Sequence, residues 1–135
     1  MVGSSVSQSL TARGDAERSL QLAVAAARTA ADNRGQDVVL LDVRERTPLF
    51  DFFVIATGTS RRQLHAMSDE IDDSLQDDLG DRRLGIEGYH ESRWIVLDYG
   101  SVVIHLLDEG ARSYYRLEDL WADAKRVDWV NSVRR

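Results

Sequence analysis

The sequence predicts a single α/β (α+β) domain in which a mixed sheet of about five strands packs with helices. The chain has 135 residues, a length that fits one domain with its own core. Its residues are 43% hydrophobic and 30% charged, an ordinary mixture for a globular protein. Segments with helical spacing of apolar residues alternate with short β-branched and aliphatic runs, without internal repeats. That alternation is typical of a layered structure with helices on a sheet.

The first expected helix begins at Asp15 and ends near Gly35, which offers a stop. Four apolar residues recur within it at helical spacing: Leu20, Val24, Ala27 and Ala31. Residues 1–14 are rich in serine and lack this periodicity, so we expect a flexible N-terminal tail there. An organelle transit peptide is the alternative for this tail, although Arg13 is its only basic residue.

Two buried strands are expected after this helix. Residues 38–43 form a compact aliphatic run that is too short for a helix. Residues 44–49 contain the only proline of the chain and should form a loop. Residues 52–56 are the second apolar run, and residues 57–59 end it with Thr-Gly-Thr. Both runs are typical of strands that are covered on two faces.

A capping box predicts where the second helix begins. Ser60 and Gln63 have the S-x-x-Q spacing, in which the serine side chain accepts from the Gln63 backbone N–H and the glutamine reaches back. The apolar stripe of this helix is Leu64, Met67, Ile71 and Leu75. We expect six acidic residues to face water: Asp69, Glu70, Asp72, Asp73, Asp77 and Asp78. Gly80 should end the helix.

Three more strands are expected, at residues 84–88, 94–97 and 102–107. The last two should form a hairpin, because Gly100 can take the positive φ that the tight turn between them demands. Apolar spacing predicts a last helix over residues 117–124. The polar segment 127–135 then holds Trp129 and Val130 as candidate packing residues.

Composition excludes several classes of function. The chain has no cysteine, so disulfides, thiolate metal sites and a cysteine nucleophile are excluded. Seventeen basic residues against 23 acidic ones give a net charge of −6, which opposes attraction to a polyanion, so we expect no direct, sequence-specific nucleic-acid binding. The apolar runs are far shorter than the ~20 residues that cross a bilayer, and no secretory signal opens the chain. We therefore expect a cytoplasmic protein without a membrane contact.

The turn at residues 58–60 is a candidate anion site. It lies between a strand and a helix N-terminus, with Arg61 and Arg62 close by. It lacks the sequence of a nucleophile elbow or a phosphate loop. Its layout is similar to that of nucleotidyltransferases, but the next strand carries only Glu87 where that family places two carboxylates for magnesium. Capping is therefore the favoured role of Ser60.

The histidines offer one weak catalytic arrangement. His65, His90 and His105 lie in different elements and lack the spacing of metal ligands. His105 lies in a hairpin strand, and Asp98 at the neighbouring hairpin end could pair with it for acid–base work. A hydrogen-bonded structural role for His105 is the alternative. The sequence assigns no residue to catalysis, to a metal or to a cofactor.

The hairpin strand has two faces, since side chains alternate along it. One face carries Trp94, Val96 and Asp98, and the other carries Ile95, Leu97 and Tyr99. An outward Trp94 or Tyr99 would be an anchor for a protein partner, because aromatic residues are over-represented in binding hot spots. The alternative is that both rings complete the core.

Five motifs stand in order along the chain: DFFVIATGTS at 51–60, IEG at 86–88, WIVLDYG at 94–100, VVIH at 102–105 and LEDLW at 117–121. Together they resemble the ribosomal silencing factor family (RsfS), also called Iojap-like. Asp42, near the end of the first strand, fits the same resemblance. The resemblance implies a ribosomal silencing factor domain over residues 15–121, followed by a C-terminal extension at 122–135.

This resemblance implies a non-catalytic translation repressor. Such a factor binds the large ribosomal subunit through ribosomal protein fourteen (uL14) and sterically blocks joining of the small subunit. In that family the hairpin-opening tryptophan and the residue before the hairpin glycine are associated with the partner contact, and these match Trp94 and Tyr99. Asp98, Gly100 and Ser101 complete the expected contact. Ser101 departs from the family, which commonly has aspartate there, so this position of the turn supplies no charge.

Two further expectations concern partners and alternatives. The apolar face could pair with its own copy before the ribosome is bound, so we expect a reversible homodimer. There are two alternative functions: a nucleotidyltransferase-like enzyme, and a ribosome assembly factor that contacts RNA.

Overall fold

The computed structural model describes residues 2–131 and confirms the mixed sheet packed with helices. The strands are β1 (Gln36–Asp42), β2 (Phe52–Gly58), β3 (Gly85–Glu87), β4 (Trp94–Asp98), β5 (Val102–Asp108) and β6 (Lys125–Arg126). Their spatial order is β3-β4-β5-β2-β1-β6. Strands β2 and β5 run parallel, from Phe52 opposite Val102 to Gly58 opposite Asp108, whereas the other pairs are antiparallel.

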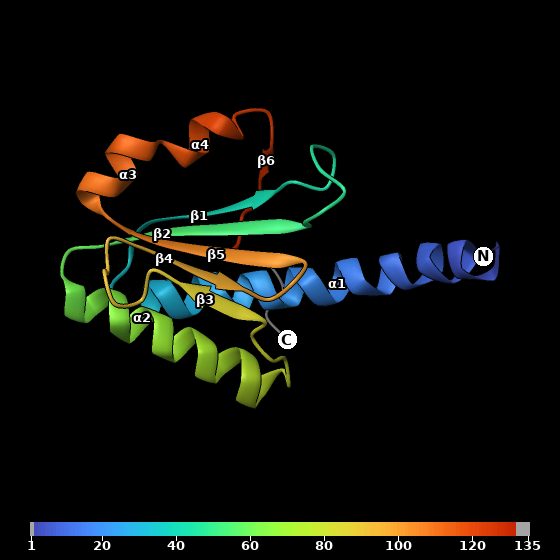
Figure 1. Cartoon of the computed structure of the whole chain (residues 1–135), viewed down its shortest axis with the longest axis horizontal. Helices are drawn as coiled ribbons and strands as arrows, with labels where there is room; N and C mark the ends of the chain where they lie inside the picture. Colours follow the sequence, from blue (N-terminus) through green and yellow to red (C-terminus); the bar gives the residue numbers. More distant parts are fainter. Residues whose placement is uncertain (1, 132–135) are drawn as a thin grey trace.

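The helices lie on both faces of this sheet. They are α1 (Val2–Asp32), α2 (Arg61–Asp73), the short π-helix η1 (Ser74–Asp78), α3 (Glu109–Tyr115) and α4 (Leu117–Leu120). Figure 1 shows α1 and α2 on one face, with α3 and α4 on the other. No helix in the described part of the chain has an apolar stretch long enough to cross a membrane.

The main core lies between the sheet and the pair α1 and α2. The predicted apolar stripe of α2 and η1 is fully buried there: Leu64, Met67, Ile71 and Leu75. Central strand β2 is buried along its whole length, as its unbroken apolar run predicts. From the hairpin, Ile95 and Leu97 enter the same core, so the alternation predicted for β4 is confirmed.

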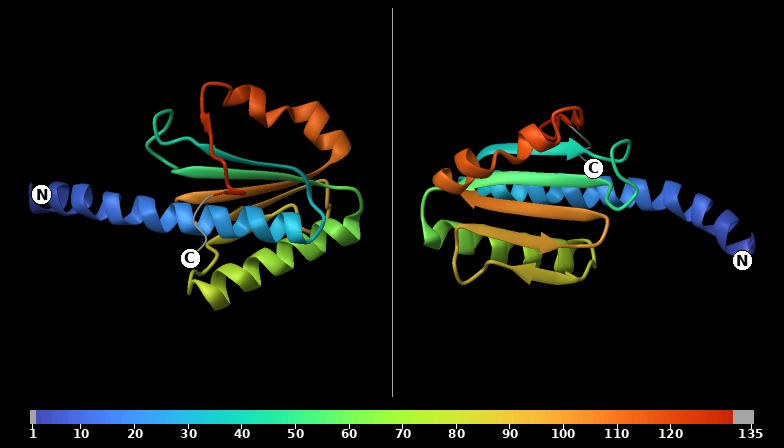
Figure 2. Two further views of the ribbon diagram at one scale, coloured as in Figure 1. Left: turned by 180° about the vertical axis from the view of Figure 1, so that it is seen from behind. Right: turned by 45° about the horizontal axis from the view of Figure 1, so that its top comes forward.

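Helix α1 begins at Val2, within the segment expected to be a flexible tail. Its first turns project beyond the edge of the sheet (Figures 1 and 2), so they have no sheet to pack against. The tail predicted at residues 1–14 therefore coincides with the projecting part of α1, and its flexibility stays a prediction. Residue 1, and residues 132–135 of the predicted extension, lie outside the described residues.

The helix predicted over residues 117–124 begins at Leu117 as expected, but it is shorter than predicted and is not the only helix after β5. Helix α3 precedes it, and α4 ends already at Leu120, whose side chain is 74% exposed. Asp108 caps α3 by accepting from the Ala111 N–H at 2.7 Å. Glycine is a poor helix former, so Gly110 hid this helix in the sequence. Arg116, at φ 51°, separates α3 from α4.

A sixth strand was missed because β6 has only two residues, both charged and exposed. Residues 122–131, which we call the C-terminal strap, run along the outer edge of β1 (Figure 2). The strap is held by the β6 ladder, by a 2.8 Å bond from the Val127 N–H to the Leu40 carbonyl, and by Trp129. The indole Nε1–H of Trp129 donates to the Val38 carbonyl at 3.1 Å, so the predicted packing role of Trp129 is confirmed. Val130, by contrast, is 54% exposed.

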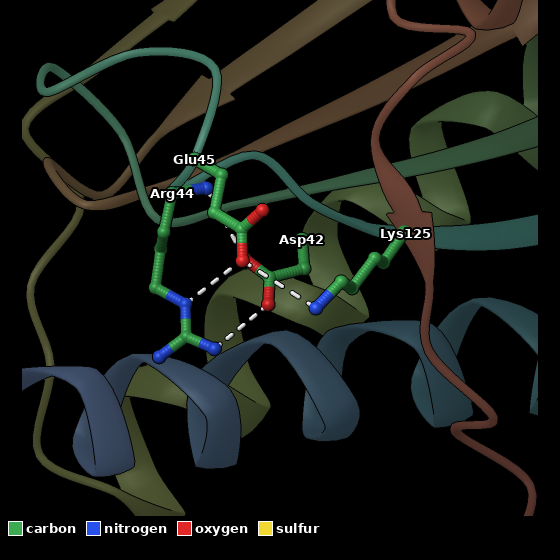
Figure 3. Close-up of polar contacts among 4 residues, drawn as sticks. All are labelled: Asp42, Arg44, Glu45 and Lys125. Carbon is green, nitrogen blue, oxygen red and sulfur yellow. Dashed lines mark hydrogen bonds and ion pairs between the residues drawn. The ribbon is translucent and has the colours of Figure 1, made fainter.

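Charged contacts beside β6 contribute little to the stability of the strap. Figure 3 shows Arg44 hydrogen-bonded to both carboxylate oxygens of Asp42, at 2.9 and 2.7 Å. This bond holds the pKa of Asp42 below its usual range. Lys125 of the strap reaches Glu45 at 3.4 Å, and both side chains are exposed. Exposed ion pairs contribute at most about 1 kcal/mol, so Trp129 and the ladder hold the strap.

We therefore expect Trp129→Ala to lower the free energy of unfolding by about 1–3 kcal/mol, because a half-buried indole and its bond to the sheet edge are lost. Urea unfolding followed by circular dichroism measures this change. Val130→Ala, on the same strap, is the control and should change stability by less than about 0.5 kcal/mol. Equal losses in the two variants would show that Trp129 does not anchor the strap.

Candidate partner-binding face

The second face of the sheet is only partly covered. Helices α3 and α4 lie over β1, β2 and β5, and Figure 2 shows β3 and β4 outside their cover. Aromatic and apolar side chains gather where this cover ends. We call this group the aromatic face, and it consists of Trp94, Val96, His105, Tyr114 and Tyr115.

Rings of the aromatic face touch in a row. Trp94 lies 4.6 Å from Tyr115 between ring centroids, and Tyr115 lies 5.0 Å from Tyr114 at 90°. Tyr114 is 78% exposed and Tyr115 48%, whereas Trp94 is half-buried. Edge-to-face and tilted pairs at these distances are favourable, so the rings form an ordered surface. An exposed row of this kind is typical of a protein-binding site.

The two tyrosines were missed by the sequence analysis. They reach the face because the Asp108 cap starts α3 directly after β5, which places the end of that helix beside Trp94. The adjacent pair of aromatic residues in a polar stretch, Ser113 to Arg116, was the available signal.

His105 is bonded to Trp94 and does not pair with Asp98. The indole Nε1–H of Trp94 donates to Nδ1 of His105 at 3.1 Å. In the ladder His105 lies opposite Val96, while Asp98 lies opposite Val103 and its Oδ1 accepts from the Gly100 N–H at 2.8 Å. The predicted acid–base pair was therefore wrong, and the structural alternative for His105 holds. Burial lowers the pKa of His105 to about 4, so its ring is neutral at pH 7.

This depressed pKa gives a stability prediction. An unfolded histidine titrates near pH 6.5, so between about pH 6.5 and 4 the unfolded chain binds a proton that the folded chain does not. Stability should therefore be lost as the pH falls through this window and should be unaffected by this group above it. At pH 5 the loss from His105 is up to about 2 kcal/mol. Urea unfolding of wild type and His105→Asn at pH 7 and pH 5 measures it, because carboxylate titration is common to both proteins. Equal pH dependence in the two would contradict this assignment.

Tyr99 points away from the aromatic face. Its ring is 5% exposed and lies in the main core, and its hydroxyl donates to Asp72 Oδ1 at 2.5 Å. Asp72, which was expected to face water, is half-buried and also pairs with Arg83 at 3.0 Å. Burial, together with the bond to Asp72, raises the pKa of Tyr99 well above its usual range. Trp94 and Tyr99 thus lie on opposite faces of the hairpin, about 16 Å apart along the strand.

The hairpin turn is tied to α1 and to the loop before β2. Gly100 has φ +88°, as predicted for this turn. The Ser101 hydroxyl lies 2.5 Å from that of the buried Ser19, and the Ser101 carbonyl accepts from the Asp51 N–H at 2.7 Å. The residues expected to contact a partner are therefore split: Trp94 lies on the aromatic face, and the turn residues lie at the far end of the hairpin.

The turn before α2 has a structural role. The Ser60 side chain accepts from the Gln63 N–H at 3.0 Å, which confirms the predicted cap. The Gln63 side chain does not close the box on Ser60; its Oε1 accepts from the Thr59 N–H at 2.6 Å and its Nε2 donates to the Arg34 carbonyl at 2.7 Å. It thereby joins the start of α2 to the end of α1.

The geometry gives the nucleotidyltransferase alternative no support. Glu87 lies exposed on the edge strand β3. Among the described side chains, no three histidines or carboxylates come together in a way that could hold a metal ion. Magnesium chemistry of the nucleotidyltransferase kind needs at least a second carboxylate beside Glu87.

Comparison with known proteins gives a consistent result. The family model described as "Ribosomal silencing factor during starvation" matches residues 16–135. The chain is 39% identical over 103 residues to the ribosomal silencing factor RsfS of Bacillus subtilis. These residues cover 76% of this chain and 86% of that protein. It is 36% identical over 88 residues to a mouse protein named "Mitochondrial assembly of ribosomal large subunit protein 1", covering 64% of this chain and 39% of the mouse protein.

The fold has a close counterpart among solved structures. A crystal structure of a Chromobacterium violaceum protein superimposes with a TM-score of 0.73 at 32% identity. The superposition covers 77% of this chain and 86% of that one.

Proposed function

The chain belongs to the ribosomal silencing factor family, and from this membership we propose that it represses translation by binding the large ribosomal subunit through uL14. In this proposal the bound factor occupies the place of the small subunit and thereby prevents joining. The observation that carries the proposal is the row Trp94, Tyr115 and Tyr114 beside the uncovered strands. No catalytic step is needed. A cytoplasmic location, where subunits join, is part of the proposal.

The size and charge of the chain support docking onto a protein. A standard interface buries about 800 Å² per partner, and the aromatic face is continued by the uncovered strands β3 and β4 (Figure 2). The net charge of −6 favours encounter with a basic ribosomal protein and opposes stray contact with RNA. Tyr114 and Tyr115 are well suited to such a contact, because each joins a large apolar area to a polar tip.

Steric exclusion is sufficient for repression. When factor and small subunit exclude each other, joining weakens by RT ln(1 + [factor]/Kd), which is about 2.7 kcal/mol at a hundredfold excess over Kd. Light scattering of purified subunits, mixed with and without saturating protein, tests this directly. We expect slower and less complete joining when the large subunit is loaded first. Joining that is unchanged at saturation would reject the proposal.

Binding to the large ribosomal subunit at 50 and 200 mM salt separates protein docking from RNA contact, because the subunit presents both uL14 and RNA. A factor held by RNA phosphates loses affinity steeply over this range, whereas docking through the aromatic face should depend weakly on salt. A steep loss would favour the second candidate, a role in assembly of the large subunit. The name of the mouse relative is the observation that favours that candidate.

A reversible homodimer through the aromatic face is a further part of the proposal. Two copies of the exposed tyrosine pair could meet about a two-fold axis before the ribosome is bound. Sedimentation velocity over 1–100 μM, for wild type and Tyr114→Ala, tests this. A wild type that stays monomeric throughout would exclude the dimer.

A further inference from the structure

Trp94 and His105 are coupled across the hairpin in a way that no predicted role explains. They lie on neighbouring strands, and Trp94, which pairs with Leu107 in the ladder, reaches diagonally to place its Nε1–H on His105 Nδ1 at 3.1 Å. Indole nitrogen can only donate, and a neutral histidine offers one accepting nitrogen. The bond therefore fixes the tautomer of His105, with its proton on Nε2.

The histidine ring is itself held in place. Phe53 of β2 meets it edge-on, with ring centroids 5.3 Å apart at 80°. The rings that contact His105 are those of Trp94 and Phe53, and the strand residues opposite its backbone are Val96 and Ile55. These four neighbours carry no charge, so they do not favour the charged form of the ring. A rigid, neutral acceptor is thus presented to the indole.

We propose that His105 is a positioning residue, which holds the Trp94 indole in the orientation that the partner of the aromatic face binds. This inference rests on the proposed function, since it assigns His105 a role in the same contact. The Tyr115 ring lies tilted against the indole, with ring centroids 4.6 Å apart at 49°, so Trp94 has two ring partners before any partner protein arrives. Fixing a side chain in advance reduces the ordering cost of binding.

Two substitutions of His105 separate positioning from packing. In His105→Asn the side-chain oxygen can stand near the place of Nδ1 and accept from the indole, whereas His105→Leu fills a similar space without an acceptor. The first readout is the ¹H–¹⁵N resonance of the Trp94 indole, assigned with Trp94→Phe. We expect His105→Leu to shift this resonance and speed its exchange with water, and His105→Asn to keep both close to wild type. The Trp129 resonance, bonded to a carbonyl, is the internal reference.

The second readout is affinity for the large ribosomal subunit. We expect His105→Leu to weaken binding by about two- to tenfold and His105→Asn to stay within about twofold of wild type. A Trp94 resonance that is unmoved in His105→Leu would overturn the positioning role, and so would a moved resonance with unchanged affinity. Failure of the wild type itself to bind the subunit would overturn the proposed function instead. The resonance would still report whether His105 holds Trp94.

Acid titration of the wild type covers the case in which His105→Leu does not fold. Protonation turns Nδ1 from an acceptor into a donor, so the Trp94 bond must break. We expect the Trp94 indole resonance to move with a midpoint near pH 4, following the lowered pKa of His105, while Trp129 stays fixed. A Trp94 resonance that does not respond to pH down to 3.5 in folded protein would overturn the proposal.

Discussion

Trp94→Ala should weaken binding to isolated uL14 at least about thirtyfold, which corresponds to about 2 kcal/mol or more. The indole is the centre of the aromatic face: it contacts Tyr115 and His105 and is half-buried already in the unbound protein. Removing it deletes the largest apolar surface of the contact and leaves Tyr115 without its neighbour. Isothermal titration calorimetry with uL14 measures the loss.

Tyr89→Ala is a matched control for this experiment. Tyr89 is also a half-buried aromatic residue, but it stacks on His65 of α2 at 4.1 Å, on the other side of the sheet. Its removal should change affinity by less than about twofold. Folding of both variants is checked by circular dichroism before titration. Equal affinities of Trp94→Ala and wild type would reject the aromatic face as the binding surface.

Local patterns in the sequence were sufficient for much of the fold. The cap at Ser60 and the turn at Gly100 each depend on neighbouring residues, and the structure confirms both. Alternation along β4 likewise predicted which side chains share a face. It could not predict which of the two faces α1 and α2 cover, because that depends on contacts between segments far apart in the sequence.

The elements and the contact that were predicted wrongly depend on tertiary structure and leave no local pattern in the sequence. Helix α3 contains Gly110 and a single buried residue, Ala111, so its sequence shows no apolar stripe. Strand β6 is made by pairing alone, since Lys125 and Arg126 have no strand preference. The suggested partnership of His105 with Asp98 failed because contact across a hairpin depends on register, which places Val96 opposite His105.

The residues predicted to contact the partner, Trp94 and Tyr99, lie in different surroundings that the sequence alone does not reveal. Trp94 opens β4 and Tyr99 directly follows its last residue, and the family resemblance joins them in one contact. The structure places the Tyr99 ring in the main core and Trp94 at the surface. A direct role of Tyr99 in partner binding therefore stays a prediction, and it can be separated from its structural role by substitution.

Tyr99→Ala should lower the free energy of unfolding by about 3–5 kcal/mol, since it empties a buried aromatic site and leaves Asp72 without its hydroxyl partner. Tyr99→Phe keeps the ring and should cost about 1.5–3 kcal/mol, the range for a hydrogen bond to a charged acceptor. Arg83 still pairs with Asp72 in that variant, which places the expected cost toward the lower end. Urea unfolding measures the loss of stability in both variants. Tyr114→Ala, at an exposed position, is the control, and its free energy of unfolding should stay close to that of wild type.

Binding by Tyr99→Phe then distinguishes the two roles. Because the hydroxyl points toward α2 and away from the aromatic face, a folded Tyr99→Phe should bind uL14 within about twofold of wild type. A loss as large as that of Trp94→Ala, without a matching loss of stability, would mean that the partner reaches the Tyr99 hydroxyl. The far end of the hairpin would then belong to the binding surface, and the Tyr99 hydroxyl would have to separate from Asp72 of α2 when the partner binds.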